Sequence, residues 1–138
     1  MPKLLKPLAL LTGVICVAIG VAHFLFGARI VAGGGDFTPS IDSQEHFYGV
    51  IFAGYGLGYV RAARQDPIQT GLIRFLATLM LVGGIGRIIS WIDQGRPHAM
   101  WIALGAVEFV VPALFFLLLA AHDQANGEAD GVEELGQA

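Results

Sequence analysis

Four long apolar segments occupy most of this chain of 138 residues. They cover about residues 8–27, 43–60, 68–91 and 99–121, and the second is the shortest and the richest in glycine. At about 1.5 Å per residue, helices of this length suit a hydrocarbon core of roughly 30 Å. Because the segments are apolar on nearly every face, we predict membrane-inserted helices in place of the amphipathic helices of a soluble protein.

Short connections predict that successive helices run antiparallel. The expected fold is an all-α, integral membrane, four-helix up-down-up-down bundle within residues 1–121. Small residues let helices approach closely in lipid, where no hydrophobic force drives them together. The candidate contact residues are Gly13, Gly20, Gly49, Ala53, Gly54, Gly58, Gly83, Gly84 and Gly86.

Charged residues make up only 14% of the chain, against about 25% in a typical soluble domain. Five of the acidic residues lie in the last 16 positions, and residues 122–138 contain no aromatic side chain. We therefore predict a disordered, acidic, cytoplasmic tail. No basic stripe is present, so nucleic-acid binding is not expected. The single cysteine, Cys16, lies in an apolar run and is expected to be an inert small hydrophobe.

Basic residues predict how the chain is oriented, because they concentrate on the cytoplasmic side of a membrane. The N-terminal end and the second connection together carry more of them than the first and third connections. Both termini are therefore expected to be cytoplasmic. The first apolar segment is longer than the 7–15 residues usual in a signal peptide, so it is expected to be retained. The basic residues compared are Lys3, Lys6, Arg61, Arg64 and Arg74 against Arg29 and Arg96.

Each apolar segment carries an ionisable residue that is expected to lie in the outer half of the membrane. A lone charge at the centre of a membrane helix costs about 2.5–3.5 kcal/mol on insertion scales, so such residues turn inward and find partners. Arg87 and Glu108 lie at depths that a long arginine side chain can bridge. We predict one polar cluster centred on that pair. Its expected members are His23, Glu45, Arg87, Ser90 and Glu108.

Three roles for this cluster stay open. Arg87 and Glu108, joined by Glu45, can form a buried ion pair that fixes helix register. The same groups can bind a ligand or a lipid headgroup, or one glutamate can serve as a general base. Haem between His23 and His46 is disfavoured, because His46 lies at the mouth of a helix and no second histidine lies deep in the bundle. Metal ligation by His23, His46 and Glu45 is disfavoured, because no dense ligand motif exists. We therefore expect no cofactor and no metal.

Local signals place the ends of the middle helices. Asp42 or Ser43 can cap the second helix, which puts Glu45 in its first turn. Pro67 suits the first position of the third helix, where its missing N–H costs nothing.

Three features in order resemble a known family. The second helix opens with the run from Glu45 to Tyr48, the third contains the run from Gly84 to Ser90, and Glu108 precedes Pro112 in the fourth. With the turn at 95–97, these resemble the small bacterial membrane proteins of the domain of unknown function 4345 family, over about residues 8–121. The resemblance implies four membrane helices in a bacterial inner membrane and no established reaction.

The resemblance also implies a polar signature of Glu45, Arg87 and Glu108. In that family an arginine often follows the first glutamate, whereas this chain has His46. In size and layout the chain is more weakly similar to the lipid-uptake-coordinator type of accessory subunit of Mce lipid importers.

The chain is small and has short loops, which leaves little room for a catalytic domain. We expect a non-catalytic accessory or stabilising subunit of a larger inner-membrane assembly, such as a lipid transporter. Its expected partners are membrane lipids and other integral membrane proteins. The alternatives are a stand-alone lipid or quinone binder, and a small membrane enzyme that uses Glu45, Arg87 and Glu108.

Overall fold

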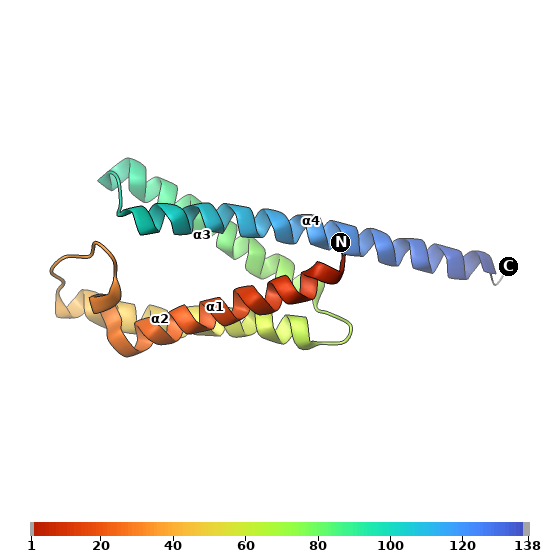
Figure 1. Cartoon of the computed structure of the whole chain (residues 1–138), viewed down its shortest axis with the longest axis horizontal. Coiled ribbons are helices and arrows are strands. Elements are labelled where there is room, and N and C mark those ends of the chain that lie inside the picture. The colour runs from red at the N-terminus through yellow and green to blue at the C-terminus, as the bar shows by residue number, and fades with distance from the viewer. Residues whose placement is uncertain (1, 137–138) are drawn as a thin grey trace.

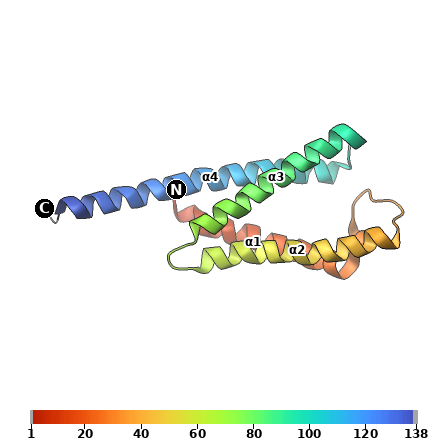
Figure 2. The same ribbon diagram turned by 180° about the vertical axis from the view of Figure 1, so that it is seen from behind.

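The chain folds into four long helices that alternate in direction (Figure 1, Figure 2). The structure is a computed structural model that describes the backbone of residues 2–136 and the side chains of residues 3–129. It confirms the predicted all-α, up-down-up-down bundle. The elements are η1 Pro2–Leu4, α1 Leu5–Phe26, η2 Gly27–Ile30, α2 Pro39–Arg64, α3 Thr70–Gln94 and α4 Ala99–Gly136.

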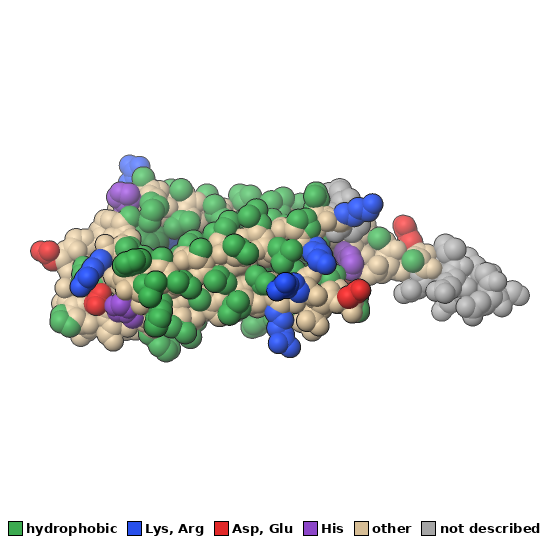
Figure 3. Space-filling view, turned by 60° about the horizontal axis from the view of Figure 1, so that its bottom comes forward, with side chains coloured by type: hydrophobic (Ala, Val, Ile, Leu, Met, Phe, Trp, Pro, Cys, Tyr) green, Lys and Arg blue, Asp and Glu red, His purple; other side chains and the backbone are tan. Residues whose placement is uncertain are grey.

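Three stretches of helix are long and apolar enough to cross a membrane: Leu5–Ile30, Thr70–Gln94 and Ala99–Ala129. Helix α2 is not among them, because its first turns are polar and its apolar part, residues 47–60, is short. Large apolar side chains lie exposed along all four long helices. Figure 3 shows them over the middle of one face, with most charged side chains toward its two ends. This is the surface of a membrane protein.

Glycines let α1 and α2 pack with their backbones in contact. A Cβ atom on Gly13 would lie 2.7 Å from the carbonyl oxygen of Gly56, and one on Gly49 would lie 2.7 Å from that of Gly20. A Cβ on Gly20 would overlap the backbone of Ala53. Because both helices space these glycines seven residues apart, the contacts repeat along the pair and fix its antiparallel register.

The other predicted contact glycines divide into two groups. Gly58 faces the Leu76 side chain at 3.1 Å, and Gly84 faces the Phe109 ring at 3.0 Å from the Cβ position. In contrast, the Cβ positions of Gly54, Gly83 and Gly86 meet no heavy atom of the described residues within 4 Å. These three glycines therefore do not serve packing within the chain.

The two helix hairpins are joined through aromatic residues near the N-terminal end of the bundle. Tyr59 is fully buried and stacks on Phe115, with 5.1 Å between ring centroids. The Tyr55 hydroxyl donates a hydrogen bond of 2.7 Å to the carbonyl oxygen of Leu76. At the opposite end, the Trp101 indole N–H donates to the carbonyl oxygen of Ala32 at 2.6 Å. The core around Tyr59 comprises Leu5, Ala9, Ala62, Ala63, Ile73, Leu76, Ala77, Phe115, Leu118 and Leu119.

Helix α2 begins earlier than predicted. The Thr38 hydroxyl, and not Asp42 or Ser43, caps it by accepting from the Ile41 N–H at 3.3 Å. Pro39 occupies the first turn, where a residue without an N–H is tolerated. The four added residues place Glu45 in the second turn, so its carboxylate is free to face α1.

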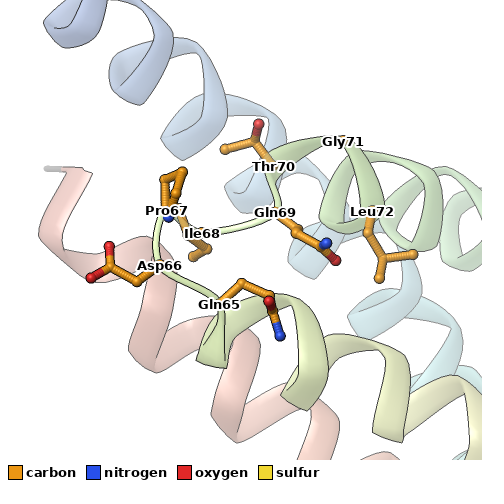
Figure 4. Close-up of a pocket in the computed structure, with 8 residues that line it drawn as sticks. All are labelled: Gln65, Asp66, Pro67, Ile68, Gln69, Thr70, Gly71 and Leu72. Atoms are coloured by element: carbon orange, nitrogen blue, oxygen red, sulfur yellow. The ribbon is translucent and has the colours of Figure 1, made fainter.

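Helix α3 begins later than predicted, at Thr70, and Pro67 lies in the connection that precedes it (Figure 4). The Gln69 N–H donates to the carbonyl oxygen of Ala62 at 3.1 Å, which turns the chain back over the end of α2. Residues 65–69 therefore form the turn between the two helices, and α3 begins only after it, at Thr70.

Helix α4 continues to Gly136, whereas the apolar pattern predicts that it ends at residue 121 and that a disordered tail follows. Residues 122–136 contain no proline, and their three glutamates and two alanines favour helix, against three glycines that do not. The first turn of this extension is also attached to α3, because Arg74 Nη2 pairs with Asp123 Oδ2 at 2.8 Å. Residues 137–138 lie outside the described part of the chain.

Candidate functional site

Arg87 of α3 and Glu108 of α4 form a two-pronged ion pair. Arg87 Nε donates to Glu108 Oε2 at 2.6 Å, and Nη2 donates to Oε1 at 2.7 Å. Such parallel, charge-assisted bonds are strong and set the geometry of both groups. The guanidinium carbon also lies 5.3 Å from the centre of the Trp101 ring, within reach of a cation–π contact. Arg87 is thus held by two different partners on α4.

His23 of α1 and Glu45 of α2 form a second pair. His23 Nδ1 lies 3.0 Å from Glu45 Oε2, and both side chains are partly buried. The glycine contacts explain this meeting, because the register that sets Gly20 against Gly49 brings the next turn of α1 to the first turns of α2.

The structure does not bring the five predicted residues into one cluster. It holds two separate pairs, one within each hairpin, and no hydrogen bond or ion pair between described residues links them. Ser90 lies one turn beyond Arg87, outside both pairs. The reason is connectivity: each short connection brings sequential helices together, so each hairpin neutralises its own charges first.

Two residues that the sequence analysis did not place at the site complete the end of the first hairpin. His46 Nδ1 lies 2.6 Å from the carbonyl oxygen of Phe24, and His46 Nε2 lies 3.4 Å from Asp42 Oδ2. A carbonyl can only accept, so His46 donates to Phe24 through Nδ1–H. The spacing of Asp42 and His46, four residues apart on one helix, is the signal that could have identified them.

Asp42 also holds the segment that follows α1. Its Oδ1 accepts from the Ala28 N–H at 2.9 Å. Gly27 makes the approach possible, because its φ is +58° and a Cβ there would overlap Asp42 Oδ1. The residues from Gly27 to Asp42 therefore form a closed, hydrogen-bonded turn.

A partly open hollow of about 520 Å³ lies between α3 and α4, beside the Arg87–Glu108 pair. Glycines, Trp91 and Trp101 form much of its wall, and Arg87 and Ser90 supply polar groups. A second hollow, of about 630 Å³, is lined by the consecutive residues 65–72 alone (Figure 4). Because no other element contributes to that second hollow, it is a surface feature of the connection.

The described residues contain no group of three or more His, Cys, Asp and Glu side chains that could hold a metal ion. The paired groups are carboxylates with basic partners. Glu108 orients the guanidinium of Arg87, and Glu45 orients the imidazole of His23. The arrangement offers hydrogen-bond donors near the end of the bundle opposite the N-terminus.

Comparison with known proteins gives one match. A family model described as Domain of unknown function (DUF4345) matches residues 4–119, which include the His23–Glu45 and Arg87–Glu108 pairs, helices α1 to α3 and α4 as far as residue 119. No curated protein matches the chain. No solved structure matches it either.

Proposed function

Since the chain belongs to the DUF4345 family, whose description states no activity, we propose a role from its surfaces. The protein acts as a non-catalytic accessory subunit that packs against other integral membrane proteins in the bacterial inner membrane. An assembly that transports lipids is the partner type that the chain's size and layout favour.

One observation carries this proposal: besides the glycines on the face that contacts α1, α2 has a glycine on the face that points away from α1. Gly54 lies in the middle of that face, and no heavy atom of the described residues approaches its Cβ position within 4 Å. Phe47, Ile51 and Leu57 flank it at helical spacing and are each more than half exposed. Glycine allows close helix contact in lipid, and α2 uses this device against α1. Gly54 offers the same contact to a helix from another protein.

The state of the two glutamates supports a non-catalytic role. Glu108 accepts two hydrogen bonds from Arg87, and Glu45 is engaged by His23. A general base must be free to take a proton from a substrate. Both carboxylates already have a basic partner, so neither is well placed for that task.

Co-purification tests the proposal. The tagged protein, extracted from its native membrane in a mild detergent, is expected to bring down at least one larger integral membrane protein in constant ratio. Gly54→Leu should abolish that recovery, because the added side chain keeps the partner helix at a distance.

Gly86→Leu serves as the matched control, since Gly86 is an equally open glycine on a different helix. It should leave recovery of the partner unchanged. Recovery of the tagged protein alone, or equal recovery with Gly54→Leu, would rule out a subunit that docks through this face.

A further inference from the structure

The hollow between α3 and α4 exists because glycines stand where side chains would fill it. No heavy atom of the described residues lies within 4 Å of the Cβ positions of Gly83 and Gly86, and Gly105 meets only Arg87 Cδ, at 3.6 Å. The volume of about 520 Å³ falls in the range of roughly 300–1,000 Å³ typical of ligand pockets. We infer that this hollow binds an uncharged amphiphile through a hydrogen-bond-accepting carbonyl oxygen.

The wall of the hollow changes character along its length. Trp91 and Pro97 border it near the α3–α4 connection, whereas Gly83 and Phe109 border it toward the middle of the bundle. Eight residues of helix separate Gly83 from Trp91, which corresponds to about 12 Å. Arg87 lies between them. A molecule that fits has its polar group near the helix ends and its apolar part directed toward the membrane centre.

Arg87 supplies the polar contact. A guanidinium has five N–H donors, and Glu108 takes one from Nε and one from Nη2. The Nη1 donors make no hydrogen bond with the described residues. Because Glu108 and the Trp101 ring hold the guanidinium in place, these donors are already oriented and a ligand need not order them. The Ser90 hydroxyl borders the same hollow one turn along α3.

The charge of the site selects an uncharged ligand. Glu108 neutralises Arg87, so the pair has no net charge. A phosphate placed against Nη1 would leave an excess negative charge beside Glu108 in a medium of low dielectric constant, which is costly. A carbonyl oxygen accepts the same hydrogen bonds without that cost. Quinones with an apolar tail and acylglycerols both present such an oxygen.

Tryptophan fluorescence can report binding directly, because the chain has two tryptophans and both border the hollow. The purified protein is placed in nanodiscs of saturated phosphatidylcholine. It is titrated with decylubiquinone and, separately, with dioleoylglycerol brominated on its acyl chains, since both quench indole fluorescence. We expect saturable quenching by at least one probe. Quenching by only one probe shows whether the ligand is a quinone or an acylglycerol. Quenching by both shows that the site recognises the carbonyl oxygen of both classes.

Matched glycine variants separate binding in the hollow from partition into the bilayer. The Cβ of Gly86→Leu would meet no heavy atom of the described residues within 4 Å, and the rest of the side chain would occupy the hollow, so the variant should raise the apparent Kd at least tenfold. Gly54→Leu adds the same side chain on α2, outside the hollow, and should bind as the unchanged protein does. This pair also distinguishes the present inference from the proposed docking face, because each variant is expected to lose one property and keep the other.

Arg87→Lys keeps the positive charge and removes the fork, so it should also weaken binding; if it fails to fold, Gly86→Leu decides alone. Three results would overturn the inference: no saturable quenching, equal quenching with Gly86→Leu, or stronger quenching by brominated dioleoylphosphatidylglycerol. The last would show that the site prefers an anionic headgroup.

Discussion

Arg87 and Glu108 depend on each other, because each neutralises the other inside a bundle that lipid surrounds. Arg87→Leu leaves the Glu108 carboxylate without its donors, and Glu108→Gln leaves Arg87 with an uncompensated charge. Each change should lower the free energy of unfolding by less than the roughly 3–5 kcal/mol that breaking a fully buried pair costs, because the two side chains are 38% and 21% exposed. Unfolding of each variant by sodium dodecyl sulfate, followed by circular dichroism, measures the loss.

The double variant Arg87→Leu with Glu108→Gln completes a thermodynamic cycle with these two single variants. It should be more stable than either single variant, because no unpaired charge remains. Single variants that unfold like the unchanged protein would contradict a mutual dependence.

Single residues also show the limit of sequence reasoning about the site. Arg87 and Glu108 could be paired from their depths in neighbouring helices. The contact between His46 and Phe24 could not be predicted, because the partner of the imidazole there is a backbone carbonyl. No side-chain pattern encodes which carbonyl a turn will leave exposed. The same applies to Trp101, whose indole N–H bonds to the carbonyl oxygen of Ala32.

At the scale of the helix, the interface between α1 and α2 makes a sharp prediction. Even Gly20→Ala should destabilise the protein, because the new Cβ would overlap the backbone of Ala53 and lie 2.6 Å from the carbonyl oxygen of Gly49. Overpacking of this kind costs about 1–3 kcal/mol. Gly54→Ala changes the same residue type where nothing is near and should leave the thermal midpoint in detergent unchanged. Equal midpoints for the two variants would show that α1 and α2 do not pack through these glycines.

The sequence predicts the number and direction of the helices, because apolar length is set by the membrane and short connections impose antiparallel order. It predicts their ends poorly. Helix α2 begins after Thr38, whose hydroxyl caps it, and Pro39 occupies its first turn. The extension of α4 is held by the ion pair between Arg74 and Asp123. Both depend on contacts that composition does not contain. Glycine spacing alone could not separate the glycines that pack, such as Gly56, from the open Gly54.

At the scale of the whole molecule, the stacking of Tyr59 on Phe115 is one of the contacts that join the two hairpins. Tyr59→Ala should weaken that joint, because the fully buried ring stacks on Phe115 and would leave a cavity. In soluble cores an aromatic-to-alanine change costs about 3–5 kcal/mol; the loss here should be smaller, because lipid in place of water removes the transfer term. Thermal unfolding in detergent measures it. Tyr48→Ala, at a side chain that is 56% exposed, should have little effect, and a similar loss from both would argue against a joint at Tyr59.

The two polar pairs do not merge into the single predicted cluster, and the packing of the two hairpins is the reason. Depth along a helix follows from counting residues, and it correctly indicated that His23 and Glu45, or Arg87 and Glu108, could meet. Whether the two pairs then meet depends on how the hairpins pack against each other. Here the hairpins join through Tyr59 and Phe115 near the N-terminal end. Those aromatic residues are ordinary members of apolar segments in the sequence.

The arrangement of the termini leads to a prediction of orientation in the membrane. The N-terminus and the α2–α3 connection lie at one end of the bundle, and the other two connections lie at the opposite end (Figure 1). The first end carries Lys3, Lys6, Arg61 and Arg64. Since basic residues favour the cytoplasmic side, that end should face the cytoplasm.

Cysteine labelling in intact cells tests this orientation. The native Cys16 is buried and is replaced by alanine, and a single cysteine is then introduced at Asp36 or at Gln65, both of which are exposed. Asp36→Cys should react with a membrane-impermeant maleimide added from outside, once the reagent has passed any outer membrane. Gln65→Cys should react only after the inner membrane is opened. The reverse pattern would place the basic end outside, and the positive charges would then have to be balanced by an anionic partner.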